Sequence, residues 1–257
     1  SLITVDVGNS RIGAALVSGS IVEDRFDGSP EGSGPDAEKR VAEAFDWCMQ
    51  EAAVRGGVEG LVLSSVVPAQ TELLEAMWFA HPGLGQRPLH VVSHLSPLPF
   101  RIDVDQSHTV GADRFCNVAG AVELGHRNAI VVDLGTANTF DVLDDGVFLG
   151  GLIGPGAVTA HRALVESGAR LPQTGFAWSS GLVGRNTADA IQAGSYHQAV
   201  GAVAHVIDRL LERFPDSSVL VTGGLAEVLG PELGDRILHL PSLTHVGAAA
   251  IGRAAAA

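Results

Sequence analysis

This chain contains very little lysine. Lys39 is the only lysine in 257 residues. A P-loop nucleotide site needs a lysine that directly follows a glycine and precedes a serine or threonine. Lys39 instead lies between Glu38 and Arg40. The sequence therefore excludes the P-loop fold, whatever nucleotide chemistry the protein carries out.

Basic residues as a group are also few. The chain has 16 lysines and arginines against 29 aspartates and glutamates, and its formal net charge is -13. This charge argues against nucleic acid and anionic membranes as main partners. It does not exclude an anionic substrate, because backbone amides and single arginines can override the global field.

Cysteines are also few, and long apolar runs are absent from the sequence. We expect the two cysteines, Cys48 and Cys116, to stay reduced thiols in helices, and their separation argues against a structural zinc site. No apolar run approaches the ~20 residues that span a bilayer, and no signal segment opens the chain. With 46% hydrophobic residues, we expect well-buried cores in a soluble, cytoplasmic protein.

One short motif is present twice. Asp133-Leu-Gly-Thr-Ala137 follows an apolar run, and Asp6-Val-Gly-Asn-Ser10 repeats the pattern of apolar strand, acid, glycine and small polar residues. In each copy a buried strand brings its acid to the open end, and a glycine turn leaves amides and hydroxyls facing a cleft. These groups suit phosphate oxygens, and the carboxylate suits a cation. A repeat near half the chain predicts two related lobes with phosphates between them.

Strand and helix patterns alternate along the chain, which predicts an α/β protein. Predicted strands cover 2–7, 12–17, 21–26, 60–67, 89–92, 129–132, 138–143, 218–221 and 237–240, and another leads from 146 into a glycine-rich turn. Helices are predicted from Pro35-Asp36 onward and over 72–79, 110–124, 157–167, 186–214 and 246–256. Residues 27–34 are predicted to form a loop and 175–184 a mobile loop. The connection 93–107 predicts a lobe boundary that divides 1–107 from 108–257.

The order of these motifs along the chain resembles one family. The motifs are Asp6-Val-Gly-Asn-Ser10, Ser64-Ser-Val-Val-Pro68, Gly111-Ala-Asp-Arg114, Asp133-Leu-Gly-Thr-Ala137, Gly150-Gly-Leu-Ile-Gly-Pro-Gly156, Gly184-Arg-Asn-Thr187 and Thr222-Gly-Gly224. From Leu2 to about Ala256 the chain resembles type III pantothenate kinase, a branch of the actin/hexokinase/Hsp70 superfamily. The resemblance implies two RNase H-like α/β lobes with a cleft between them. It also implies phosphorylation of pantothenate by ATP, the first step of coenzyme A biosynthesis, by a homodimer with Mg²⁺ and a monovalent cation, K⁺ or NH₄⁺.

The resemblance implies a set of nucleotide and cation ligands. The first phosphate loop comprises Asp6, Val7, Gly8, Asn9, Ser10, Arg11, Ile12 and Gly13. Gly8 lets the backbone approach phosphates, Asn9 and Ser10 supply donors, and Asp6 can hold Mg²⁺. The alternative is an ordinary polar hairpin turn. In the second half, Asp133 matches the monovalent-cation ligand, Thr136 the second ATP contact, and Gly223 and Gly224 the adenosine turn.

Gly111, Ala112, Asp113 and Arg114 match the substrate motif of the family, in which Asp113 is the general base. Glycine frees the backbone there, and the helix start is expected to keep the carboxylate ionised so that it can accept the proton of an alcohol. Arg114 can pair with the carboxylate end of an anionic substrate. The alternative is an N-terminal helix acid that pairs with its neighbour.

Thr187 corresponds to a threonine that reaches the substrate across the dimer interface. The alternative is an ordinary helix N-cap. Gly194 and Gly201 on the helix that follows would permit close approach of a second chain, so we expect this helix in a two-fold interface.

Three positions depart from the family pattern. Val104 stands in the substrate pocket where the family has tyrosine, Leu225 replaces an acid on the adenosine side, and Ser10 replaces threonine. The first two changes leave open a non-catalytic nucleotide-binding regulatory homologue, or a kinase for another small alcohol. Because Asp6 and Asp113 are both retained, we expect an active pantothenate kinase.

Overall fold

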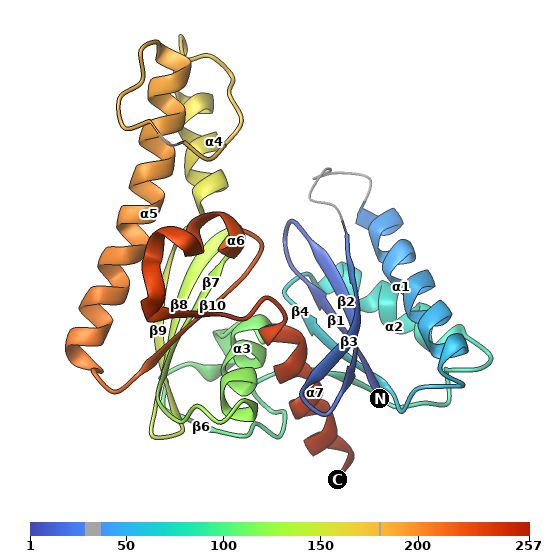
Figure 1. Cartoon of the computed structure of the whole chain (residues 1–257). Helices are drawn as coiled ribbons and strands as arrows, with labels where there is room; N and C mark the ends of the chain where they lie inside the picture. Colours follow the sequence, from blue (N-terminus) through green and yellow to red (C-terminus); the bar gives the residue numbers. More distant parts are fainter. Residues whose placement is uncertain (29–36, 180) are drawn as a thin grey trace. The chain divides into compact units, whose positions relative to one another are not determined.

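The computed structural model describes residues 1–28, 37–179 and 181–257. Contacts divide these residues into two units (Figure 1). The first unit is Ser1–Arg127, Gly146–Phe148 and Ser242–Ala257, and the second is Asn128–Asp145 and Leu149–Pro241. This division differs from the predicted boundary near residue 107, because two helices beyond that residue pack in the first unit.

The first unit contains a five-stranded sheet with the order β3-β2-β1-β4-β5. Its strands are β1 (Leu2–Val7), β2 (Ile12–Ser18), β3 (Ile21–Asp27), β4 (Leu61–Ser65) and β5 (Leu89–Val91). Strands β1, β2 and β3 are antiparallel to one another, whereas β4 is parallel to β1 and β5 to β4. This mixed pattern brings the carboxyl ends of β1 and β4 to the same edge of the sheet.

Helices cover both faces of this sheet. On one face, Phe45 of α1 (Ala37–Val54) and Trp78 of α2 (Pro68–Ala80) share a core with alternate residues of β1, including Ile3 and Val5. Thr4 points to the other face, where its hydroxyl hydrogen-bonds His245 of α7 (Leu243–Ala256) at 2.9 Å. Helix α3 (Ala112–Glu123) packs against α7 on that face. Successive side chains of β1 point to opposite faces of the sheet, so one face meets an apolar core and the other a partly polar one.

The second unit repeats this strand order as β9-β8-β7-β10-β11. Its strands are β7 (Ala129–Leu134), β8 (Ala137–Asp144), β9 (Val147–Pro155), β10 (Ser218–Thr222) and β11 (Ile237–His239). The first residues of β9 cluster with the first unit, where they pair with the short strand β6 (Arg101–Ile102). Equal strand order in both units confirms the predicted repeat of two α/β lobes.

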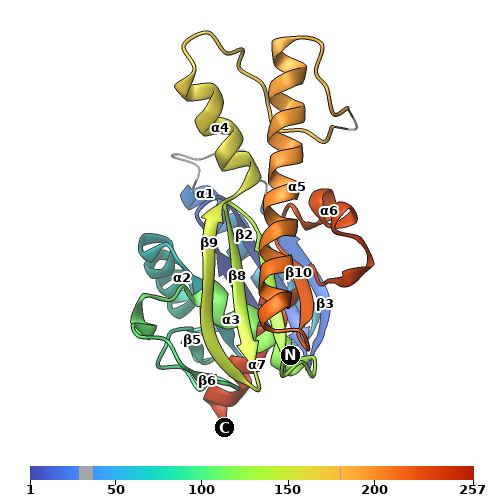
Figure 2. The ribbon, with the colours of Figure 1, turned by 90° about the vertical axis from the view of Figure 1, so that its left-hand side faces the viewer.

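One long helix covers a face of the second sheet. Val203 and Ile207 of α5 (Thr187–Arg213) pack on β7 and β10 through Ile130 and Val219. Helix α4 (Ala157–Ser167) runs beside α5 (Figure 2). The short helix α6 (Ala226–Leu229) and the 3-10 helix Gly230–Arg236 follow β10.

Most predicted elements are confirmed, with differences at their ends. Helix α2 begins at Pro68 rather than at residue 72, because proline suits the first turn of a helix. Strand β6 was not predicted. The expected helix start at Pro35-Asp36 and most of the loop 27–34 lie outside the described residues.

The described parts of the loop 175–184 are tied to α5. The carbonyl oxygens of Gly175 and Gly181 accept hydrogen bonds from Gln192 and His197, at 3.5 and 3.3 Å. The mobility of this loop stays a prediction.

Both cysteines are free and buried in helices, as expected. In the parts of the chain that the structure describes, no helix combines the length and the apolar character needed to cross a membrane.

Candidate active site

The first acid–glycine loop connects β1 and β2. Asp6 is the penultimate residue of β1, and the amide of Gly8 donates to the carbonyl of Arg11 at 2.9 Å, which closes a tight turn. The guanidinium of Arg40 on α1 donates to the carbonyl oxygen of Ser10 at 3.1 Å, so this helix braces the loop. The loop therefore has the compact backbone that a phosphate site needs.

The predicted phosphate-loop residues differ in what they can offer a ligand. Val7 and Ile12 are buried, with 1% and 3% exposure, so only their backbone can serve a nucleotide. Asn9 and Arg11 are exposed, and Asp6, Gly8, Ser10 and Gly13 are half-buried. Gly13 lies against His245, whose burial lowers its pKa to about 4 and keeps the ring neutral.

Ser64, to which the sequence patterns assign no role, contacts Asp6 in the first acid–glycine loop. Ser64 on β4 lies in register with Asp6 on β1, and its hydroxyl donates to Oδ1 of Asp6 at 2.7 Å. Ser64 is fully buried. The motif Ser64–Pro68 was a sequence signal for this residue, but strand pairing is needed to reveal the contact.

Asp113 lies in the first turn of α3, as predicted, directly after Gly111 and Ala112. Its Oδ1 accepts the backbone amide of Arg114 at 2.8 Å. A side chain at position 111 would displace this oxygen, so glycine there lets the Asp113 carboxylate keep its position. Ala112 is buried and supplies packing.

Burial raises the pKa of Asp113, and the amide and charge of Arg114 oppose this effect without overcoming it. A helix start by itself lowers the pKa of a carboxyl, but desolvation is the larger influence on Asp113. That the carboxylate is ionised in the working enzyme stays a prediction. A raised pKa makes the carboxylate a stronger base once it is ionised.

Aromatic rings support the neighbouring arginine. The guanidinium carbon of Arg114 lies 5.7 Å from the ring centroid of Phe148, within the range of a cation–π contact. Phe148 is fully buried and packs with Phe100 and Phe115, with ring centroids 6.1 Å from each. Val104 is half-buried in the segment after β6, and its role in substrate binding stays a prediction.

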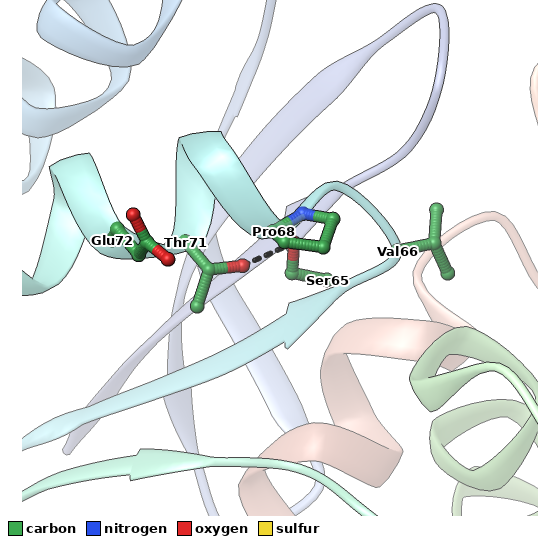
Figure 3. A pocket seen from close by; sticks show the side chains of 5 residues that line it. All are labelled: Ser65, Val66, Pro68, Thr71 and Glu72. Carbon is green, nitrogen blue, oxygen red and sulfur yellow. Dashed lines mark hydrogen bonds between the residues drawn. The ribbon is translucent and has the colours of Figure 1, made fainter.

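An open pocket of about 350 Å³ adjoins this motif (Figure 3). It is lined by Ser65, Val66, Pro68, Thr71 and Glu72. Val66 connects the pocket to the motif, because its Cγ1 lies 3.4 Å from the position that a Cβ on Gly111 would take. Figure 3 shows Thr71 pointing back to Ser65, to which its hydroxyl donates at 2.7 Å. The pocket therefore combines apolar, hydroxyl and carboxylate groups beside the motif that contains Asp113.

The second acid–glycine loop has equivalent geometry. Asp133 is the penultimate residue of β7 and lies in register with Thr139 on β8 and Thr222 on β10. Gly223 has φ of +93°, and a side chain there would collide with Oδ1 of Asp133 and with the backbone of Leu134. Glycine is required at this turn because both its φ and its space exclude a side chain.

The start of α4 braces the same loop. The carbonyl oxygen of Thr136 accepts hydrogen bonds from the amide of Gly156 at 3.0 Å and from the hydroxyl of Thr159 at 2.7 Å. A side chain on Gly156 would collide with the carbonyl of Gly135. Thr136 and Gly224 are exposed, so both can meet a ligand. The two loops belong to different units, and the cleft expected to join them stays a prediction.

Thr187 is the first residue of α5 and is exposed. Its alternative role as the helix N-cap is wrong, because Asn186 occupies that position and its side chain accepts the amide of Asp189 at 2.9 Å. The capping requirement is thus met without the Thr187 hydroxyl.

Among the described residues, protein side chains alone do not form a closed metal centre. Within residues 1–28, 37–179 and 181–257, no three histidine, cysteine, aspartate or glutamate side chains gather closely enough to hold an ion. A single carboxylate such as Asp6 suits an ion that takes most of its ligands from water and phosphate, as Mg²⁺ does.

Comparison with solved structures defines the class of protein. The chain is similar to a ROK family glucokinase from Streptomyces griseus, in complex with glucose and AMPPNP, with a TM-score of 0.53 and 15% identity over 96% of this chain and 97% of the other. It is also similar to a proposed Baf family transcriptional activator from Campylobacter jejuni, with a TM-score of 0.56 and 19% identity over 98% and 97%. These similarities show the fold alone, an α/β fold of the actin/hexokinase class.

Sequence comparison identifies the family within this class. The model of the type III pantothenate kinase family matches residues 2–209. The type III pantothenate kinase of Moorella thermoacetica is 32% identical over 92% of this chain and 93% of its own length. That of Acidothermus cellulolyticus is 31% identical over 96% and 95%. The chain belongs to the type III pantothenate kinase family.

Proposed function

We propose that this chain transfers the γ-phosphoryl group of ATP to the primary hydroxyl of pantothenate, the first step of coenzyme A biosynthesis in the cytoplasm. Family membership supplies the substrates. The structural observation that carries the proposal is Asp113, a carboxylate with a raised pKa in the first turn of α3. Phosphoryl transfer requires little covalent chemistry from a protein, so a positioned acceptor for the alcohol proton is its main chemical task.

Substrate binding falls to groups around Asp113. The guanidinium of Arg114, supported by Phe148, would pair with the carboxylate of pantothenate. The pocket beside Gly111 offers Val66 and Pro68 to the branched apolar part of the substrate. The hydroxyl of pantothenate would then face Asp113, which accepts its proton as the oxygen attacks phosphorus.

The first phosphate loop would bind the phosphates and their Mg²⁺. Backbone amides around Gly8 and the side chains of Asn9 and Ser10 suit phosphate oxygens. Asp6, with Ser64 hydrogen-bonded to it, would hold Mg²⁺ directly or through water, and Mg²⁺ neutralises the charge that develops on the phosphates.

The second unit would supply the adenosine and monovalent-cation contacts. Thr136 would meet the phosphates, and the turn at Gly223 and Gly224 would meet the nucleoside. Asp133 next to this turn would hold K⁺ or NH₄⁺. Glycine at position 223 supports this role, because any larger residue there would place a side chain against Oδ1 of Asp133.

We further propose that a second copy of the chain completes each site. Leu182 and Val183, just before α5, are 77% and 81% exposed, and a Cβ on Gly201 would meet nothing within 4 Å. A two-fold interface here would cover these apolar side chains and bring Thr187 to the partner's substrate. Sedimentation should show a dimer that Gly201→Glu converts to a monomer. A monomeric parent protein at micromolar concentration would contradict the proposed assembly.

A coupled assay of ADP release tests the activity. We expect release that depends on pantothenate, and mass spectrometry should detect phosphopantothenate as the product. ATP binding without turnover would favour the regulatory homologue. Turnover with a different small alcohol, but not with pantothenate, would favour another kinase.

A further inference from the structure

Ser64 carries a hydrogen bond that the proposed roles do not yet explain. Its side chain is fully buried, and a buried hydroxyl costs free energy unless it finds a partner. The partner is Oδ1 of Asp6 at 2.7 Å, a short contact of the kind made to charged oxygens. The hydrogen bond therefore joins two neighbouring strands at the point where one presents its acid.

We infer that Ser64 is a positioning residue, whose hydroxyl holds the Asp6 carboxylate in the orientation that Mg²⁺ and nucleotide phosphates require. This inference rests on the proposed role of Asp6. Groups that bind a metal are commonly oriented by a second layer of hydrogen bonds, and their loss weakens metal binding. Ser64 would be such a group, since it contacts the carboxylate rather than the ion.

The surroundings of Ser64 explain why its hydroxyl is fixed. Asp6 and Ser64 are paired in the register of parallel strands β1 and β4, so their backbones cannot shift independently. The Cys116 thiol of α3 is a second hydrogen-bond neighbour of Ser64, and its burial raises the pKa of this thiol. The hydroxyl is thus enclosed between the sheet and α3, and its rotation is limited by both.

The adjacent serine provides a matched control. The Ser65 hydroxyl accepts the amide of Val67 at 3.1 Å and the hydroxyl of Thr71 at 2.7 Å, so it fastens the start of α2. Removing either serine hydroxyl costs a local hydrogen bond. Of the two serines, Ser64 is the one that donates to Asp6, so we expect its removal, and not that of Ser65, to alter the use of Mg²⁺.

The test is calorimetric titration of a non-hydrolysable ATP analogue into the full protein at a series of Mg²⁺ concentrations. Ser64→Ala should raise the Mg²⁺ concentration that gives half of the maximal affinity by about 10-fold, the low end for loss of a hydrogen bond to a charged group. Ser65→Ala should leave this concentration unchanged. Ser64→Cys should fall between the parent and Ser64→Ala, because a thiol donates weakly.

Melting curves of the three variants separate a structural defect from loss of positioning. If Ser64→Ala does not fold, Ser64→Cys becomes the deciding variant, and it should still raise the Mg²⁺ requirement. An equal requirement in the parent and the folded Ser64 variant overturns the inference, as does nucleotide binding by the parent that is independent of Mg²⁺. The titration contains no pantothenate. If the protein binds the nucleotide but does not phosphorylate pantothenate, the proposed function is refuted. The titration still tests the role of Ser64 in that case, because it does not depend on catalysis.

Discussion

The two acid–glycine loops have the same strand arrangement and different surroundings. Asp6 and Asp133 each end a central strand that is antiparallel to the next strand of its hairpin and parallel to a later one. Both parallel neighbours place a hydroxyl residue, Ser64 or Thr222, in register with the acid. One contact can be described at each carboxylate. Ser64 donates to Asp6, whereas Oδ1 of Asp133 lies against Gly223.

These contacts suggest which ligands each of the two similar units binds. A carboxylate fixed by a buried donor suits a small ion with strict geometry, such as Mg²⁺. At Asp133, glycine at position 223 instead keeps a side chain away from the carboxylate, at the turn that we propose meets the nucleoside. The first unit also contains Asp113, so we assign it the chemical step, and we assign the second unit adenosine and monovalent-cation binding.

The largest effect should come from the acid that is proposed to take the proton. Asp113→Asn keeps the size of the side chain and an oxygen for the Arg114 amide, but it removes basicity. We expect kcat to fall by about 10²- to 10⁴-fold, the usual contribution of general-base catalysis. Steady-state kinetics with saturating ATP and pantothenate measures this change.

Arg114→Ala is the companion variant, because it should raise KM for pantothenate through loss of a charge partner. If the folded Asp113→Asn enzyme has close to the parental kcat, Asp113 is not the general base, and the assignment of the chemical step to the first unit is wrong.

A smaller effect is expected in the second unit. Asp133→Asn should lower turnover in K⁺ by about 10-fold, in line with loss of one charged ligand. It should also remove the advantage of K⁺ over Na⁺. Turnover compared in K⁺, NH₄⁺ and Na⁺ buffers provides the measurement. Equal parental rates in all three ions would show that Asp133 has no such role.

The smallest effect concerns stability. Burial raises the pKa of Asp113 above 3.8, so the folded state binds this proton more tightly than the unfolded state does. Its contribution to the free energy of unfolding is therefore lost as pH rises through the folded pKa. Asparagine carries no charge, so Asp113→Asn should melt at a higher temperature than the parent at pH 7. This advantage should shrink as pH falls toward 3.8, and a lower melting temperature of the variant at pH 7 would contradict the account.

Much of the fold could be predicted because the repeated motif fixes its own local structure. Alternating or continuous apolar runs identified β1 and β7, and the acid and glycine marked their ends. Strand β6 could not be found this way, because its two residues are too short for a pattern. The packing of α7 in the first unit was also not predictable, since it depends on distant contacts such as Thr4 with His245.

The sequence could name candidate site residues, whereas the contacts between them could not be predicted. Family motifs pointed to Asp6, Asp113 and Asp133. The role of Ser64 depends on the pairing of β1 with β4, and no periodicity in either strand reveals it. The raised pKa of Asp113 likewise depends on how deeply α3 buries its first turn, whereas helix position alone favours the ionised form.

Calorimetry of ATP binding to three variants tests the division of work most directly. Gly223→Ala introduces a side chain beside Asp133 at a position with φ of +93°, whereas Gly234→Ala adds one at φ of +73° with nothing within 4 Å. Both variants carry backbone strain, and only the first disturbs the proposed nucleotide turn. We predict that Gly223→Ala weakens ATP binding by about 10-fold or more, for a collision costing at least ~1.4 kcal/mol, and that Gly234→Ala and Asp113→Asn bind ATP like the parent. Equal loss of affinity in Gly223→Ala and Asp113→Asn, or parental affinity in Gly223→Ala, would contradict the account.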